Sequence, residues 1–288
     1  KSASAYITTR LRPTDDLSVI LGARMTSWDN DKRIYDLAGA ETSTVLQAEH
    51  DKLTPYVGIV YDVSKAWSVY AGYTSIFQPQ TYQDTSGNYL KPLLGNSYEL
   101  GVKGSLLDDR LNVSAAVFYL KQDNLGIALP GEYAPNGNSA YESVSGARTR
   151  GFELEVSGEV LPNWQLSAGF TRSVSKDKDG GVLSTEVAQN VFKLFTTYHM
   201  PNVGNGLTLG AGVRTQSAIY QDGRGPNGER FAQKGYAVVD LMGRYALTDK
   251  VSAYVNVYNL LDKKYYTGVG TAYYGAPLSM KVGLDIRY

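Results

Sequence analysis

The 288-residue sequence contains no cysteine and only two histidines, and these absences exclude several kinds of site. Without cysteine there is no disulfide framework, no thiolate metal ligand and no cysteine nucleophile. His50 and His199 are too few for a histidine-based metal site, so we expect neither a metal site nor a cofactor. Basic and acidic residues number 28 each, and this lack of a basic excess leads us to expect no nucleic-acid partner.

Long apolar runs are also missing from the sequence. A transmembrane helix needs ~20 consecutive apolar residues, and the longest runs here are short pieces such as residues 115–120. A helical membrane protein is therefore excluded, whereas membrane strands need only ~9–11 alternating residues. The 23 tyrosines and 30 glycines favour strands and turns over helices.

Alternation of apolar and polar residues is the main pattern in the chain. In residues 278–288 the apolar or aromatic residues alternate with polar residues or glycine, which places the two sets on opposite faces of a strand; the first set is Leu278, Met280, Val282, Leu284, Ile286 and Tyr288. The same alternation recurs in about thirteen runs, most of them near membrane-spanning length. Clear examples are residues 98–103, 111–120, 152–160, 164–171 and 251–258.

The connections between these runs are alternately short and long. Short turns are expected at residues 13–16, 63–66, 107–110, 161–163, 199–206 and 248–250, and long polar loops at residues 29–52, 75–96, 122–148, 173–189, 217–234 and 260–276. Short turns at one end and long loops at the other are typical of bacterial outer-membrane barrels, whereas soluble sandwiches and propellers have strands of ~5–6 residues.

The pattern therefore predicts an all-β, antiparallel transmembrane barrel in the bacterial outer membrane. Its expected surroundings are the lipid bilayer and lipopolysaccharide. Aromatic residues near strand ends fit the belts that such barrels place at the two membrane interfaces. We expect these belts to include Tyr61, Trp67, Tyr73, Tyr119, Trp164, Tyr198, Tyr245 and Tyr288.

The number of strands bears on how much of a barrel the chain contains. Bacterial single-chain barrels have even strand numbers. The first run, residues 4–11, leads into a short turn at Pro13, which would place Lys1 on the long-loop side. An odd count with an outside start does not give a closed barrel, so either the count is off by one strand or residues 1–288 are the C-terminal part of a larger barrel. We predict the second, with the N-terminal strands absent.

Several stretches resemble one family of barrels. Residues 54–80, with TPYVGIVYD followed by WSVYAGYTSIFQPQ, are similar to TonB-dependent ferric-siderophore receptors of the hydroxamate and pyoverdine branch. Further similar stretches are GNSYELGVKG at residues 95–104, TRGFELE at residues 149–155 and NVYNLLDKKYY at residues 256–266. The end departs from the family, because Tyr288 stands where a terminal phenylalanine is more usual.

The resemblance implies a fold and a function. Receptors of this family have a 22-stranded barrel, an N-terminal plug domain and a TonB box; the plug, the box and about nine strands are not found in this sequence. The implied function is binding of a ferric siderophore at the extracellular face and import with energy from the TonB complex, which the plug contacts. Ferric iron would enter only as the siderophore chelate.

Aromatic residues in the long loops and at the upper strand ends are the candidate ligand contacts. A ferric siderophore is polar and often partly aromatic, so tyrosine, tryptophan and phenylalanine faces suit it. The candidates are Trp28, Phe77, Tyr82, Tyr89, Tyr141, Tyr220, Tyr273 and Tyr274. Gln78 and Gln80 carry hydrogen-bonding groups in the same region, and Arg224 and Arg230 flank a glycine-rich loop that could attract an anionic chelate.

Two other functions remain as alternatives, a passive porin and an outer-membrane enzyme. A hydrolase at the rim would use a histidine-based pair or triad. His50 lies next to Asp51 on the long-loop side, and His199 is expected in a short turn on the other side, so the two histidines do not share a site. We therefore expect the protein not to be an enzyme.

Overall fold

The computed structural model describes residues 1–225, 227–270 and 272–287, and among these it leaves out the side chains of residue 34 and residues 42–45. Its strands are β1 (Ser2–Thr14), β2 (Leu17–Tyr35), β3 (Glu41–Asp62), β4 (Trp67–Gln78), β5 (Leu93–Leu106), β6 (Leu111–Asp123), β7 (Leu125–Tyr133), β8 (Ser139–Val144), β9 (Ala147–Leu161), β10 (Trp164–Lys176), β11 (Val182–Leu183), β12 (Asn190–Met200), β13 (Leu207–Gln216), β14 (Ile219–Gln221), β15 (Phe231–Gln233), β16 (Tyr236–Ala246), β17 (Val251–Tyr258) and β18 (Ser279–Ile286).

Thirteen of these strands follow one another in a single hydrogen-bonded order, β1-β2-β3-β4-β5-β6-β9-β10-β12-β13-β16-β17-β18, and β11 pairs with β10. This confirms the predicted all-β fold and its approximate strand count. The described part of the chain contains no helix that is long and apolar enough to cross a membrane. Two compact units are distinguished: residues 1–63, 69–100 and 118–148 in the first, and residues 64–68, 101–117 and 149–287 in the second.

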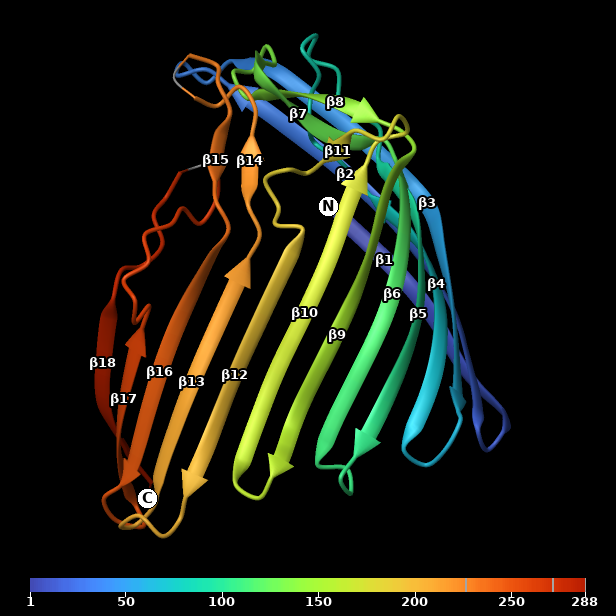
Figure 1. Cartoon of the computed structure of the whole chain (residues 1–288). Coiled ribbons are helices and arrows are strands. Elements are labelled where there is room, and N and C mark those ends of the chain that lie inside the picture. Colours follow the sequence, from blue (N-terminus) through green and yellow to red (C-terminus); the bar gives the residue numbers. More distant parts are fainter. Residues whose placement is uncertain (226, 271, 288) are drawn as a thin grey trace. The chain divides into compact units, whose positions relative to one another are not determined.

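In the second unit, β12, β13, β16, β17 and β18 run side by side (Figure 1). Residues directly opposite each other in neighbouring strands share a face of the sheet. The register aligns Leu194 with Val213 and Val213 with Val239, and the next residues along, Lys193 and Arg214, pair on the other face. In β12 and β13 these two rows are therefore apolar on one face and basic on the other, as the alternation predicts for a wall between lipid and water, whereas in β16 the second row continues with Val238.

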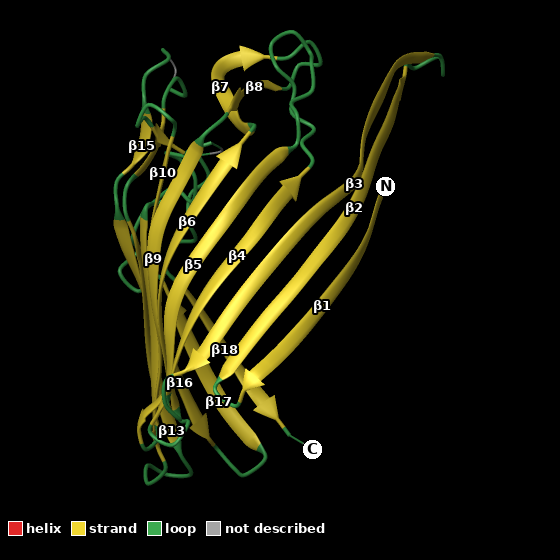
Figure 2. Cartoon of the chain, turned by 90° about the vertical axis from the view of Figure 1, so that its right-hand side faces the viewer, coloured by secondary structure: helices red, strands yellow, loops and turns green. Residues whose placement is uncertain are grey.

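In the first unit, β2 and β3 extend together beyond β1 as a hairpin (Figure 2). The prediction of a loop at residues 29–52 is wrong here, because β2 continues to Tyr35 and β3 begins at Glu41. Asn30 pairs with Gln47, and its side-chain amide donates a 3.0 Å hydrogen bond to Gln47 Oε1. Cross-strand pairing satisfies the backbone without an apolar face, so apolar alternation gave no indication of these strands.

Other predicted loops also contain paired segments. Residues 122–148 include the antiparallel hairpin β7–β8, and residues 217–234 include β14–β15. His199 is not in a turn as predicted, but pairs with Thr208 near the end of β12. The short turns at the other ends of the strands agree with the prediction.

Aromatic side chains next to the short turns are exposed on the surface of the chain. Trp164 follows the turn at residues 162–163, its ring is 6.5 Å from that of Tyr198, and its indole nitrogen donates to Thr196 Oγ1 at 2.7 Å. Tyr61, Trp67 and Tyr245 also lie within a few residues of short turns; Tyr288 lies outside the described residues. An apolar ring with a tied polar group suits a membrane interface.

Candidate ligand-binding site

A hollow of about 500 Å³ in the first unit brings together two of the predicted contact residues, Trp28 and Phe77. Trp28 comes from β2, and Phe77 comes from the end of β4. Both residues are half-buried and line the hollow. The two residues are 49 positions apart in the sequence, and the order and register of the strands bring them to one place.

Arg24 also lines this hollow and is the one charged side chain among the described residues that do so. It pairs with Tyr6 on one side and Thr54 on the other, which places it on the polar face of β2. Its guanidinium donates a 3.0 Å hydrogen bond to Ser4 Oγ. Arg24 was not among the predicted contacts; its position on the polar side of an alternating strand was the only indication in the sequence.

A second group of predicted residues gathers around the loop that follows β4. The rings of Tyr82 and Tyr141 are stacked, with their centroids 4.1 Å apart and their planes at 15°. Burial, and to a smaller extent the neighbouring Tyr82, raises the pKa of the Tyr141 hydroxyl. Tyr89 forms an isolated antiparallel bridge with Gln83 in the same loop. Three of the eight candidates thus belong to one local structure.

The side chain of Gln80 forms hydrogen bonds that hold this loop together. It is 7% exposed, and its side-chain nitrogen donates to the carbonyls of Lys91 and Asn124 at 2.6 Å each. Its side-chain oxygen accepts a 3.2 Å hydrogen bond from the amide of Gly126. Both polar atoms of its side chain are therefore used within the chain, and the side chain of Gln80 is not available to a ligand.

In the second unit, Tyr220 lies on β14 beneath Arg230, whose guanidinium carbon is 3.8 Å from the ring centroid. Arg230 also forms an ion pair with Asp222 at 2.6 Å. The hydrogen bond and ion pair with Arg230 lower the pKa of the Asp222 carboxyl below its ordinary value of 3.8. Arg230 is therefore partly occupied, which reduces its value as a contact for an anionic ligand. Arg224 donates to the carbonyl of Gly270.

Tyr273 and Tyr274 lie in the loop between β17 and β18 and are 70% and 67% exposed. Tyr274 stacks on Tyr266 at a centroid distance of 4.5 Å, and their hydroxyls are 3.0 Å apart. Phe231 of β15 meets the ring of Tyr266 edge-on at 5.2 Å. These contacts tie the loop to hairpin β14–β15 and leave the ring of Tyr273 exposed.

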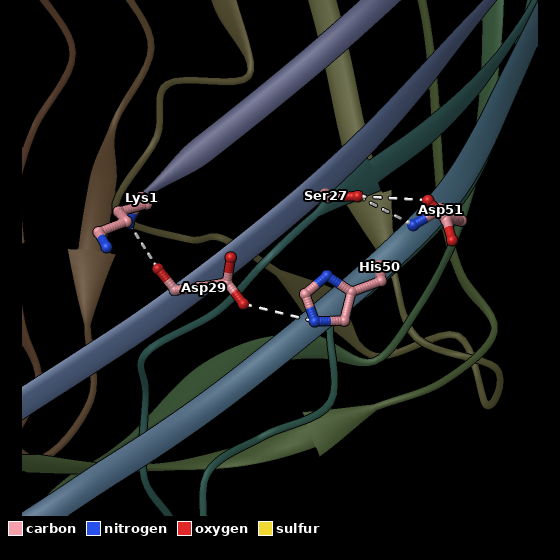
Figure 3. A network of polar contacts seen from close by, with 5 residues as sticks. All are labelled: Lys1, Ser27, Asp29, His50 and Asp51. Carbon is pink, nitrogen blue, oxygen red and sulfur yellow. Dashed lines mark hydrogen bonds and ion pairs between the residues drawn. The ribbon is translucent and has the colours of Figure 1, made fainter.

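A small network around His50 tests the enzymatic alternative (Figure 3). His50 Nε2 lies 3.4 Å from Asp29 Oδ1, whereas Ser27 Oγ contacts the backbone nitrogen and the carboxylate of Asp51 at 3.2 and 3.4 Å. A serine–histidine pair requires a hydrogen bond between those two side chains, and the network has none. In the described part of the chain, no three histidine, aspartate or glutamate residues are grouped as a metal site.

The arrangement of long antiparallel strands, with an apolar face, a polar face and aromatic residues at the strand ends, defines an outer-membrane β-barrel protein. Residues 1–260 match the family model described as TonB dependent receptor-like, beta-barrel. The chain belongs to this family of TonB-dependent receptors.

Relatives with solved or curated descriptions agree with this assignment. The chain is 38% identical over 288 residues to the ferric-pyoverdine 358 receptor of Pseudomonas putida, covering 99% of this chain and 35% of that protein. It is 39% identical to the ferripyoverdine receptor of Pseudomonas aeruginosa, covering 97% and 34%. The crystal structure of that receptor bound to ferripyoverdine superimposes with a TM-score of 0.81 at 38% identity, covering 99% of this chain and 38% of the other. The chain therefore spans about a third of the length of the curated relatives it matches.

Proposed function

We propose that this chain forms the C-terminal part of the barrel of an outer-membrane receptor for ferric siderophores. The receptor binds the chelate at its extracellular face and imports it with energy from the TonB complex. A plug domain, together with further strands, would complete the receptor and provide the TonB contact. The family of the chain and the names of its relatives support this proposal.

The observation that carries the proposal is the hollow formed by Trp28, Phe77 and Arg24. Two aromatic faces bind the planar or apolar parts of a chelate, and a guanidinium attracts an anionic one. Because the hollow is open to solvent, the electrostatic attraction of Arg24 is screened by salt. The open hollow, with its two aromatic side chains and one guanidinium, therefore fits a mid-sized, polar and partly aromatic ligand.

The other predicted contacts form a wider set of proposed ligand residues. The set consists of Tyr89 in the first unit and Tyr220, Tyr273 and Tyr274 in the second; Tyr82 and Tyr141 stack on each other in a separate hollow and are left out of it. Tyr273 has the most accessible ring of the second group. The stacked or cation-bound rings are less accessible, so we rank them below Trp28 and Phe77.

The test is binding of a ferric pyoverdine, labelled with radioactive iron, to outer membranes that carry the complete receptor. Trp28→Ala and Phe77→Ala should each weaken binding by roughly tenfold or more, as expected for aromatic residues at the centre of a binding site. Trp67→Phe, at the short-turn end of β4, is the matched control and should leave the affinity unchanged.

Arg24→Gln adds a second measurement, because it removes the charge and retains hydrogen-bonding capacity. We expect weaker binding at low salt and a smaller dependence of the affinity on salt than in the unmodified receptor. Equal affinities for the Trp28, Phe77 and Trp67 variants would contradict the placement of the site. A large ion conductance of the complete receptor in a planar bilayer would instead support a porin.

A further inference from the structure

A second hollow lies between the loop after β4 and hairpin β7–β8, within the first unit. Its volume is about 360 Å³. The side chains that line it come from two segments more than 50 residues apart. Hairpin β7–β8 is visible near the upper ends of β4 and β5 in Figure 2. The lining residues are Thr81, Tyr82, Gln83, Ala134, Asn136, Asn138, Ser139 and Tyr141.

The lining is neutral and rich in hydrogen-bonding groups. It combines two tyrosines, three side-chain amides and two hydroxyl side chains, and none of these residues carries a charge near neutral pH. The stacked pair of Tyr82 and Tyr141 forms an aromatic wall, and 43% of the surface of Tyr82 is exposed. A charged ligand would find no counter-charge here, and a purely apolar ligand would leave the amides and hydroxyls without partners.

Hydrogen bonds within the chain hold this lining in place. Gln83 is central: its side-chain nitrogen donates to the carbonyl of Gly87 at 2.8 Å, and its side-chain oxygen accepts from the amide of Asn136. The backbone carbonyl of Gln83 accepts a 2.9 Å hydrogen bond from the amide of Tyr141. Because these hydrogen bonds already fix the lining, its side chains lose less conformational entropy when a ligand binds.

Other polar groups of the hollow remain open to a ligand. Among the described residues, the hydroxyls of Thr81, Ser139, Tyr82 and Tyr141 and the side-chain amide of Asn138 have no hydrogen-bond partner. These groups supply both donors and acceptors beside an aromatic face. The lining is thus divided into a fixed frame and a set of free hydrogen-bonding groups.

We propose that this hollow binds a neutral sugar ring. A pyranose presents a face of C–H groups that packs on an aromatic ring and a rim of hydroxyls that both donate and accept hydrogen bonds. Tyr82 and Tyr141 would contact the C–H face, while Asn138, Ser139 and Thr81 would contact the hydroxyls. The hollow accommodates a sugar unit and not a whole ferric chelate.

Two sources can provide this chemistry at the extracellular end of an outer-membrane barrel. One is the saccharide part of lipopolysaccharide in the same membrane, and the other is a soluble glycan. Tyr82 and Tyr141 would therefore contact a sugar and not the siderophore that the sequence predicts for them. This assignment rests on the geometry of this hollow and not on siderophore binding.

The test is saturation-transfer NMR on the full protein in detergent micelles, with three separate probes: methyl α-D-glucopyranoside, N-acetyl-D-glucosamine and the lipid-free core oligosaccharide of lipopolysaccharide. Glycerol is the negative control. We expect transfer from tyrosine ring protons to the sugar C–H protons, and stronger transfer to the source that the site serves. Transfer to the core oligosaccharide alone indicates lipopolysaccharide, whereas transfer to the monosaccharides at equal strength indicates soluble glycans.

Two variants connect the signal to this hollow. Tyr82→Ala and Asn138→Ala should each reduce the transfer at least several-fold, and Tyr133→Ala, an exposed tyrosine on β7 outside the lining, should not. Transfer no greater than that to glycerol, or equal loss in the Tyr133 variant, would overturn the proposal. So would displacement of the sugar by a ferric pyoverdine, since the hollow would then belong to the siderophore site. Trp28→Ala should leave the transfer to the sugar unchanged, because Trp28 lines the other hollow. The sugar signal and siderophore binding therefore report on two different hollows, and either proposal can fail without the other.

Discussion

Removing the side chain of Gln80 should loosen the loop that follows β4 without unfolding the barrel. In Gln80→Leu, the carbonyls of Lys91 and Asn124 and the amide of Gly126 lose the partners that they have in the native loop. A hydrogen bond contributes ~0.5–1.5 kcal/mol net, so three of them contribute about 1.5–4.5 kcal/mol. Because water reaches part of this loop, we expect a local loss of about 2–3 kcal/mol.

Deuterium exchange of backbone amides, followed by mass spectrometry, measures this loss. A local opening free energy that falls by about 2–3 kcal/mol accelerates exchange roughly 30- to 150-fold. The acceleration should be confined to residues 79–92 and 124–144, while peptides from β12 and β13 keep their native rates. The loop is the part affected because Gln80 joins its two ends, and the strand ladders do not depend on it.

Two further variants make the measurement specific. Gln80→Glu preserves the shape and the acceptor oxygen but removes both donated hydrogen bonds, so it should also accelerate exchange. Gln78→Leu, at the exposed end of β4, should not. Native exchange rates in Gln80→Leu would refute the view that this glutamine holds the loop together.

Two other predictions concern Gly158 and Asp222 of the second unit. Gly158 has a φ of +133°, and a Cβ there would lie 2.0 Å from the carbonyl oxygen of Arg110, so Gly158→Ala should destabilise by ~2–4 kcal/mol. Gly72→Ala, where the space is open, should change stability by less than ~1 kcal/mol, and an equal shift of the two urea midpoints would contradict the steric argument. The ion pair of Asp222 with Arg230 lowers the pKa of that carboxyl, so its contribution is present above pH 3.8 and is lost as the pH falls through the lower folded-state pKa. The exchange rate of the amides in residues 217–235, divided by their intrinsic rate at the same pH, should therefore rise in acid, and Asp222→Asn should remove that rise. If the variant keeps the same acid response, the ion pair is not its cause.

The candidate site shows what a sequence can indicate about a barrel of this kind. Trp28 and Phe77 could be predicted as contacts, because aromatic residues in the long loops and at the upper strand ends suit a partly aromatic chelate. Their common hollow could not be foreseen, since it depends on the lateral order of β1 to β4. Arg24 was missed because one arginine among many polar residues on the inner face has no distinguishing pattern.

The loops were the least predictable part of the fold. The hairpin extension of β2 and β3 has no alternating apolar run, and hairpin β7–β8 has only a short one at Leu125, Ile127 and Leu129. Backbone pairing and side-chain amides such as those of Gln80 and Gln83 hold these segments together. Such contacts join residues far apart in the sequence and leave no local pattern.

Residue periodicity is enough to identify this protein as an antiparallel barrel wall with short turns at one end and long loops at the other. The physical reason is that lipid on one side and water on the other impose alternation on every spanning strand, and alternation is a local property. The folded chain is needed to see which loop aromatic residues line a common hollow and which are stacked against or covered by neighbouring side chains. Those relations depend on strand register and on long-range hydrogen bonds, which one-dimensional periodicity does not record.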